Sequence, residues 1–426
     1  MALRKIGVGI IGSGRMGRLR AYLAAGDPRV SFLALSDADP DRAGRIAEEV
    51  NADFHSGDNE AVLTHPDVEA VIVSTPEHAH ADPVCRALEL GKTVLVEKPL
   101  DLSLEAADRI LDAVRRYKGD LHVGYTQRLR RRYLNAKEQI SQGRLGKLLT
   151  ARMCLYNPQS NAREIYARSP HASPVTDTLT YVVDIGLWYF EGRKAVRVYA
   201  QGGSKIFPHP NNVGDWAWAI VTLDDGSNIS FGCSWIFPDN WPAHITTMGM
   251  DIMGSEGAIV IDDSHKGVIL ATKKGVPSPY APDASSNVVF LESMMAGDWS
   301  LGEFWGPMRD ETRLFIEHAA TGRTIPNTRP EEARATLEVT LAIEKSAAEN
   351  RPIDLPLGWV WRSGSPCPSP NPRSPDWWFS IRNSNSCGST SMGERDTSSW
   401  GMWILMARAV FSRRSRPTRG GAGRWS

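Results

Sequence analysis

The sequence predicts an α/β domain with a doubly wound parallel sheet, followed by an α+β domain with an open, mostly antiparallel sheet. Short apolar runs alternate with helical segments through residues 1–123, which is typical of a parallel sheet covered by helices. Longer strand-forming runs, with fewer helices between them, then occupy residues 124–357. The 426 residues suit two or three domains at about 150 residues each.

The first domain opens on a strand, a glycine-rich turn and a helix. Ile6-Gly7-Val8-Gly9-Ile10-Ile11 is the apolar strand, and Gly26-Asp27-Pro28 ends the helix. Further along, Gly91 has the position of a helix C-cap and Ser103 that of an N-cap. The expected strands are 6–11, 30–36, 68–74, 93–96 and 121–125, and the expected helices are 18–25, 40–50, 83–90 and one beginning after Ser103.

The second domain has long strand candidates and a few helices. Asp224-Asp225-Gly226-Ser227 joins two of the strands as a hairpin. The helices are expected to cover one face of the sheet and leave the other for substrate or a partner subunit, in a dimer or tetramer. The expected strands are 148–156, 195–201, 216–223, 228–235, 244–253 and 258–261, and the expected helices are 133–141, 176–190, 307–321 and 330–350.

Residues 358–426 form a tail of different composition. They hold ten arginines, no lysine and three acidic residues, a net charge of +7 that leaves −7 for residues 1–357. Seven of the 14 tryptophans also lie here, without a helical or alternating period. This composition suits neither a folded domain nor ordinary disorder, so we interpret the tail as the product of a shifted reading frame. A basic nucleic-acid-binding arm is the alternative.

Composition excludes several classes of protein. The counts of Lys+Arg and of Asp+Glu are both 49, so the chain as a whole does not attract nucleic acid or an anionic membrane. No apolar run reaches the roughly 20 residues of a membrane span, and no signal peptide precedes the first strand. The five cysteines form neither a C-x-x-C pair nor a disulfide pattern. We therefore expect a cytoplasmic protein.

The loop Gly12-Ser13-Gly14-Arg15-Met16-Gly17 matches a dinucleotide-binding fingerprint. Its glycines allow a tight turn, a close approach of the backbone to a pyrophosphate, and close packing of helix on strand. Asp37 ends the second strand and would accept hydrogen bonds from a ribose, which favours NAD over NADP. The alternative is a purely structural glycine turn. The residues expected to bind the cofactor are Gly12, Ser13, Gly14, Arg15, Met16, Asp37, Thr75, His80 and Glu97.

Histidines follow the third predicted strand. Ser74-Thr75-Pro76 ends that strand, and His78 and His80 lie on the loop after it. Because zinc sites use three or four ligands and no third ligand stands out, we expect no metal site. Hydrogen bonding of these histidines to the backbone is the favoured interpretation.

Lys98 is the first candidate catalytic residue. Glu97-Lys98-Pro99 closes a predicted central strand, and ligands bind at the carboxyl ends of strands in such sheets. An ammonium group there polarises a substrate hydroxyl or lowers a neighbour's pKa. A solvent-exposed lysine is the alternative, but Pro99 disfavours it by restricting the backbone of Lys98.

Residues 4 to about 356 resemble the Gfo/Idh/MocA oxidoreductases, the family of glucose-fructose oxidoreductase and inositol dehydrogenase. The glycine loop, Ser74-Thr75-Pro76-Glu77-His78-Ala79-His80 and Glu97-Lys98-Pro99 occur in the family's order. The resemblance implies a Rossmann domain followed by helices on an open sheet. It also implies a D-x-x-x-H-x-x-D stretch, which here runs from Asp177 to Asp184 with Tyr181 in place of the histidine. Family members that act on sugars or dihydrodiols also use a tyrosine there.

The resemblance implies a proton relay of three residues. Tyr181 would take the hydroxyl proton, Lys98 would lower the pKa of the phenol, and Asp177 would orient the substrate while hydride passes to NAD. The alternatives are a buried helix tyrosine for Tyr181 and a helix N-cap for Asp177.

Clues to the substrate are fewer. Arg128, in the arginine-rich stretch after the last Rossmann strand, could receive a substrate carboxylate, although a solvated basic face is the favoured interpretation. Trp188, Trp216 and Trp218 could line a cyclic substrate or fill the core. We expect an NAD-dependent dehydrogenase for a ring hydroxyl, favouring a cis-dihydrodiol of an aromatic acid that gives a catechol. The alternatives are a sugar or inositol dehydrogenase, an NAD-dependent glycosidase, and a non-catalytic dinucleotide sensor.

Overall fold

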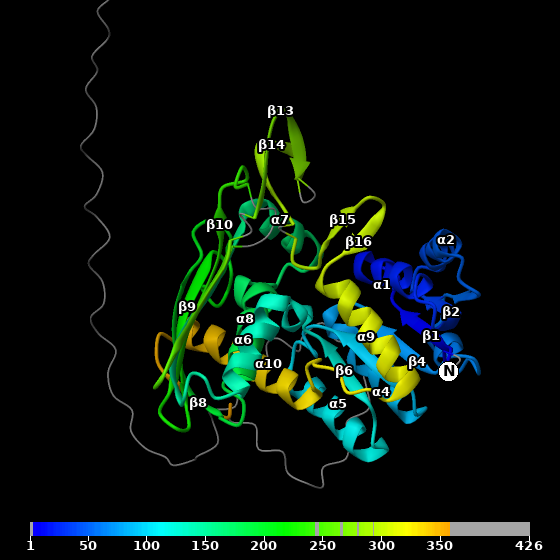
Figure 1. The fold of residues 1–426 in the computed structure, drawn as a ribbon, viewed down its shortest axis with the longest axis horizontal. Coiled ribbons are helices and arrows are strands. Elements are labelled where there is room, and N and C mark those ends of the chain that lie inside the picture. The colour runs from blue at the N-terminus through cyan, green and yellow to red at the C-terminus, as the bar shows by residue number, and fades with distance from the viewer. Residues whose placement is uncertain (1–2, 243–246, 265–266, 279–280, 293, 358–426) are drawn as a thin grey trace, which may run out of the picture. The chain divides into compact units, whose positions relative to one another are not determined.

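The computed structural model describes residues 3–242, 247–264, 267–278, 281–292 and 294–357. Its first sheet is parallel and six-stranded, in the order β3-β2-β1-β4-β5-β6. This is the doubly wound sheet that the sequence predicts, and Figure 1 draws it among its helices. The strands are β1 (Ile6–Ile11), β2 (Val30–Ser36), β3 (Phe54–Ser56), β4 (Ala70–Val73), β5 (Thr93–Glu97) and β6 (Leu121–Gly124).

Helices cover both faces of this sheet. One face packs against α1, α2 and α9, and the other against α3, α4, α5 and α10. Asp39 caps α2 and Ser103 caps α5, each by accepting a hydrogen bond from a backbone N–H of the first turn. The bounds are α1 (Arg15–Ala25), α2 (Pro40–Val50), α3 (Asn59–Leu63), α4 (Ala81–Glu89), α5 (Leu104–Tyr117), α9 (Pro307–Thr321) and α10 (Pro330–Glu349).

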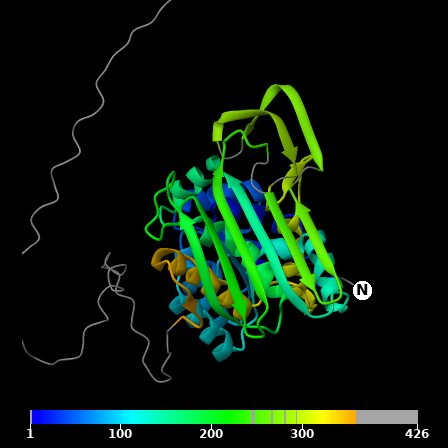
Figure 2. The same ribbon diagram turned by 90° about the vertical axis from the view of Figure 1, so that its left-hand side faces the viewer.

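The second sheet has seven strands, in the order β12-β11-β7-β10-β9-β8-β17. Its pairs are antiparallel except for β7 with β10, so the sheet is mostly antiparallel, as the sequence predicts. The inner face packs on α6 (Arg131–Ser141), α8 (Thr180–Tyr189) and α10, and Figure 2 views the opposite face. The strands are β7 (Leu148–Pro158), β8 (Ala195–Gly203), β9 (Trp216–Leu223), β10 (Asn228–Phe237), β11 (Thr247–Gly254), β12 (Ala258–Asp263) and β17 (Ile353–Asp354).

Several elements differ from the sequence prediction. The expected helix 176–190 begins as a π-helix over Pro174–Leu179 and continues as α8. The unpredicted helix α7 (Gln159–Arg168) follows β7. Two unpredicted hairpins are β13 (Val268–Ser278) with β14 (Ala281–Leu291), and β15 (Asp298–Ser300) with β16 (Glu303–Trp305). Single turns of 3₁₀-helix occur at Glu77–Ala79 and Thr126–Leu129.

Both sheets lie within one compact unit, so the domain boundary at residue 123 stays a prediction. Within the described ranges, no helix is long and apolar enough to cross a membrane. Cys85, Cys154 and Cys233 are not in disulfide bonds. The interpretation of residues 358–426 as a frameshift product concerns a segment outside the described residues.

Candidate functional site

A cleft of about 1270 Å³ lies at the carboxyl ends of the parallel strands. Its lining comes from the loops after β1, β2, β4 and β5, and from α7, the π-helix and the β15–β16 hairpin. Most of the candidate residues gather here. Those that line the cleft are Gly12, Gly14, Arg15, Met16, Asp37, Thr75, His80, Glu97, Lys98, Asp177 and Tyr181.

The glycine loop has the shape of a phosphate cradle. Gly12 has φ +91°, and a Cβ at Gly17 would lie 1.8 Å from the carbonyl oxygen of Gly12, so neither position accepts a side chain. At Gly14 no atom lies within 4 Å of the position a Cβ would take. Gly14 begins α1 without a side-chain cap, which leaves the helix terminus open to an anion. This cradle fits a dinucleotide pyrophosphate.

Ser13 and Asp37 connect the loop to the end of β2. The backbone N–H of Ser13 donates to Asp37 Oδ2 at 2.8 Å, and the Ser13 hydroxyl donates to the Ser36 carbonyl at 3.1 Å. Ser13 is buried and does not line the cleft, so its role is to hold the loop. Asp37 does line the cleft, with Arg42 3.4 Å from its carboxylate. An acid at this position fits the ribose of NAD.

His80 holds two cleft segments together. One ring nitrogen lies 2.9 Å from the Pro99 carbonyl oxygen, and the other lies 3.1 Å from the Thr75 carbonyl oxygen. The side chain is buried, and the Thr75 hydroxyl donates to the carbonyl of Ala79. His80 is therefore hydrogen-bonded to the backbone, in agreement with the favoured interpretation.

Lys98, Asp177 and Tyr181 meet in the cleft. Lys98 Nζ donates to the backbone carbonyl of Asp177 at 2.8 Å, and it lies 3.5 Å from Asp177 Oδ1. The same Nζ lies 4.7 Å from the centre of the Tyr181 ring, which is a cation–π distance. Ser173 caps the π-helix, so Asp177 is not the N-cap that the alternative supposed. Arg168 Nη2 is 3.2 Å from Asp177 Oδ1.

The electrostatics of the two acidic groups differ. Lys98 and Arg168 outweigh the cost of burial at Asp177 and lower the pKa of its carboxyl. Burial, together with Glu97 and Asp177, raises the pKa of the Tyr181 phenol well above 10. No hydrogen bond joins Lys98 Nζ to the Tyr181 hydroxyl among the described residues. In this arrangement, therefore, the pKa of the phenol lies above its ordinary value, and the lowering expected from Lys98 stays a prediction.

A buried ion-pair network lies behind these residues. Arg20 is fully buried; its Nε donates to Glu97 Oε1 at 2.8 Å and its Nη2 to Glu311 Oε2 at 2.5 Å. Arg20 also donates to the hydroxyl of Thr312. The side chain of Glu97 is thus held by α1 and α9, so its position behind Lys98 is determined by the tertiary structure.

Arg128 does not reach the cleft. Its guanidinium donates two 2.7 Å hydrogen bonds to the Asp184 carboxylate and another of 3.1 Å to Glu332. The side chain is 3% exposed, so it is neither a solvated surface residue nor available to a substrate. The expectation that Arg128 binds substrate is corrected on this ground, because a buried guanidinium paired with two carboxylates has no donor directed at the cleft.

Sequence patterns missed several residues that line the cleft. Asn157, Asn161 and Arg168 come from the end of β7 and from α7, and Trp299 comes from the β15–β16 hairpin. The helix α7 begins Gln-Ser-Asn-Ala-Arg, a polar stretch with little apolar periodicity to reveal it. Pro158 immediately before it was the available signal of a helix start.

Two family models match the chain. One is described as an oxidoreductase family with an NAD-binding Rossmann fold and covers residues 6–125. The other is described as the GFO/IDH/MocA C-terminal domain and covers residues 133–260. Together they span more than half of the chain.

Similar proteins include named dehydrogenases. The chain is 26% identical to scyllo-inositol 2-dehydrogenase (NAD(+)) of Bacillus subtilis, over 81% of this chain and 95% of that protein. It is 35% identical to the 1-carboxy-3-chloro-3,4-dihydroxycyclo hexa-1,5-diene dehydrogenase of Comamonas testosteroni, over 33% of this chain and 36% of that protein. An alignment at 27% identity with an uncharacterized oxidoreductase, YrbE of Bacillus subtilis, spans 64% of that protein, less than two thirds of its length.

Solved structures share the fold. The scyllo-inositol dehydrogenase of Lactobacillus casei with bound NAD(H) and scyllo-inositol aligns with a TM-score of 0.67 over 82% of this chain and 99% of that chain. GenD2 from gentamicin A biosynthesis, in complex with NAD, aligns with a TM-score of 0.68 over 83% of this chain and 97% of that chain. The sequence identities are 19% and 22%, respectively.

Proposed function

We propose that this chain, which belongs to the Gfo/Idh/MocA family of NAD-binding oxidoreductases, oxidises a ring hydroxyl of a cyclic polyol. The observation that carries the proposal is the meeting of Lys98, Asp177 and Tyr181 in the cleft that the glycine loop also lines. A sensor of dinucleotides would have no need of an ammonium, a carboxylate and a phenol gathered at one point.

In the proposed reaction, NAD supplies the acceptor for the hydride that leaves the substrate carbon. The substrate hydroxyl hydrogen-bonds with Tyr181 and Lys98, and its proton goes to Tyr181 as the carbonyl forms. Asp177 holds Lys98 in place through its backbone carbonyl and its carboxylate. Oxidation of one hydroxyl of a dihydrodiol gives a ketone that tautomerises to the catechol.

The pKa of the Tyr181 phenol sets a condition on this reaction. Burial and the carboxylates of Glu97, Asp177 and Glu311 keep the phenol protonated. To accept a proton near neutral pH, Tyr181 needs a stronger effect of positive charge in the loaded site. Lys98, 4.7 Å from the centre of its ring, is the cation that we propose for this role. We therefore expect the rate to rise with pH as the phenol ionises.

For the substrate, we favour a cis-dihydrodiol that carries a carboxylate. Arg168 lines the cleft with a 41% exposed side chain beside Asp177, so it can take the carboxylate-binding role first expected of Arg128. The partial match to a carboxylated dihydroxycyclohexadiene dehydrogenase supports this choice. The longer matches to inositol dehydrogenases favour inositols as the second candidate.

A substrate panel distinguishes these functions. Purified chain with NAD is offered a cis-dihydrodiol of benzoate, the unsubstituted benzene cis-dihydrodiol, myo- and scyllo-inositol, and aldoses, and NADH formation is followed by absorbance. The proposal expects faster turnover of the carboxylated diol than of the other compounds. Arg168→Gln should raise KM for that diol and leave kcat unchanged. Tight NAD binding without turnover on any ring hydroxyl would identify a sensor, and hydrolysis of a glycoside without net NADH would identify a glycosidase.

Variants of the two central residues test the mechanism. Lys98→Ala and Tyr181→Phe should each lower kcat about 100-fold or more, because each removes a group that handles the proton, while NAD affinity changes little. Tyr117→Phe, an exposed tyrosine on α5, is the matched control. Near wild-type turnover in both Lys98→Ala and Tyr181→Phe would exclude the proposed roles.

We also propose that a second copy of the chain covers the outer face of the seven-stranded sheet. Large apolar side chains are exposed on this face, among them Trp218 at 43%, Ile220 at 51% and Val260 at 74%. An apolar sheet face of this kind is typical of a subunit interface.

A further inference from the structure

Three metal-ligating side chains meet at the edge of the parallel sheet opposite the cleft. Asp120 and His122 flank the first residue of β6, whereas Lys98 follows the carboxyl end of the neighbouring parallel strand β5. His318 comes from the last turn of α9, 198 positions from Asp120. Because of that separation, no sequence pattern joined the three residues, and the sequence predicted no metal site.

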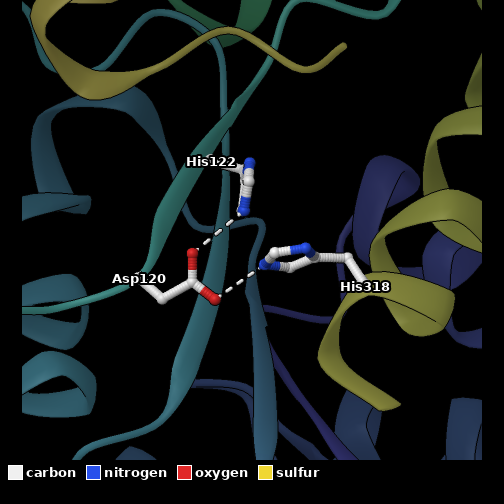
Figure 3. A group of neighbouring side chains, drawn as sticks. All are labelled: Asp120, His122 and His318. Carbon is white, nitrogen blue, oxygen red and sulfur yellow. Dashed lines mark hydrogen bonds and ion pairs between the residues drawn. The ribbon is translucent and has the colours of Figure 1, made fainter. Parts of the chain in front are cut away.

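The three side chains point toward one another (Figure 3). Asp120 Oδ1 lies 3.1 Å from His122 Nε2, and Asp120 Oδ2 lies 2.8 Å from His318 Nε2. One ligand atom from each residue lies within 4.8 Å of the other two. Residues 120 and 122 point to the same side because side chains alternate along extended chain. Small side-chain rotations would bring all three atoms to bonding distance from one ion.

The hydrogen bonds of His318 suit a metal ligand. Its Nδ1 lies 2.6 Å from the carbonyl oxygen of Arg323, and because a carbonyl only accepts, Nδ1 carries the hydrogen. A neutral imidazole then presents the lone pair of Nε2 to Asp120, whose carboxylate also only accepts. A cation between these two atoms would be bound by both. Metal-bound histidines commonly donate the other ring N–H to a backbone carbonyl in this way.

The donor set selects the class of ion. Two imidazole nitrogens and one carboxylate oxygen suit Zn²⁺, whereas Mg²⁺ and Ca²⁺ prefer oxygen ligands. His122 is largely buried, which fixes its ring, and Asp120 is exposed, which leaves an entry route and room for a water as fourth ligand. We propose that Asp120, His122 and His318 bind a divalent transition-metal ion of the zinc type.

This site would join α9 to β6. The other end of α9 carries Glu311 and Thr312, which hold Arg20 and, through it, Glu97 behind Lys98. A metal at His318 would fasten the helix at its far end without contacting the cleft. The proposal thus concerns stability and does not depend on the proposed reaction.

The test uses the full chain, purified with a tag that lacks histidine, stripped with a chelator and titrated with Zn²⁺ and with Co²⁺. We expect one ion per chain, the visible absorption of tetrahedral Co²⁺, and a melting temperature that rises by a few degrees with Zn²⁺. His318→Ala and Asp120→Asn should weaken binding at least about tenfold. His55→Ala, an exposed histidine on β3, should bind as the wild type does.

X-ray absorption of the zinc-loaded wild type keeps the test independent of variant folding. Two imidazoles and one or two oxygens around zinc support the proposal. It is overturned if the stripped chain binds no zinc, if the absorption spectrum lacks two imidazoles, or if His318→Ala binds as tightly as His55→Ala. In those cases, His318 and Asp120 are joined by a hydrogen bond without a metal.

Discussion

Glu311 is a buried carboxyl near the site that lies between opposing electrostatic effects. Its carboxylate is fully buried and pairs with Arg20, which Glu97 shares. Burial, with Glu97 and Asp184 as further anions, outweighs the attraction of Arg20 and raises the pKa of Glu311 to about 7. Near neutral pH the Glu311 carboxyl therefore changes between its neutral and its charged form. The charged form is one of the groups that raise the pKa of the Tyr181 phenol.

This pKa predicts a pH dependence of stability. Between its ordinary value of 4.5 and about 7, Glu311 holds a proton in the folded state that it has lost in the unfolded state. The free energy of unfolding should therefore fall as pH rises through this window, by on the order of a few kcal/mol, and level off above it. Glu311→Gln should remove that fall when urea unfolding is compared at about pH 5 and about pH 8.

The control for Glu311 is a glutamate of the same helix. Arg323 lowers the pKa of Glu317, so Glu317→Gln should leave the fall between pH 5 and pH 8 unchanged. If the free energy of unfolding falls equally with pH in the Glu311→Gln and Glu317→Gln variants, groups other than Glu311 cause the pH dependence.

At the scale of elements, the β15–β16 hairpin binds the second half of the chain to the cofactor helix. Trp299 lines the cleft and packs edge-on against Tyr22 of α1, at 4.9 Å between ring centres. Phe304 is buried with Leu23 and Met308 beneath it. The hairpin therefore covers the side of α1 next to the glycine loop.

This placement predicts a contribution of Trp299 to cofactor binding. Trp299→Ala should weaken NAD binding, measured as the dissociation constant, by roughly tenfold, as loss of one aromatic contact costs about 1–1.5 kcal/mol. Energy transfer from tryptophan to NADH should fall as well. Trp305→Ala is the matched control, because Trp305 lies on the same hairpin, is equally exposed and does not line the cleft. Equal NAD affinity in the two variants would show that Trp299 does not contribute to cofactor binding.

At the scale of the whole molecule, the outer face of the seven-stranded sheet is the surface that we propose for self-association. Ile220→Lys places a charge on that face, on the interior strand β9, and should shift the chain toward monomers in light scattering after gel filtration. Leu102→Lys, at a similarly exposed leucine before α5, should leave the mass unchanged. A monomeric wild type at micromolar concentration would refute this interface.

The extent of the sequence prediction depends on the range of the interactions concerned. Strands β1, β2 and β9 and helices α2 and α9 have the expected bounds, because local apolar periodicity and end signals such as Asp39 and Pro307 specify them. α7 has a start signal at Pro158 but little apolar periodicity, and the sequence did not predict the β15–β16 hairpin. They are held by contacts with distant segments, such as Trp299 with Tyr22.

The sequence by itself determined the fold class, the dinucleotide loop and the group of Lys98, Asp177 and Tyr181, because these depend on local pattern and on short motifs in a recognisable order. Only the tertiary structure decided how charges pair. It buried Arg128 against Asp184, set Glu311 and Glu97 around Arg20, and brought His318 to Asp120. Such pairs join residues far apart in the chain, and the burial that shifts a pKa arises only when the core closes around them.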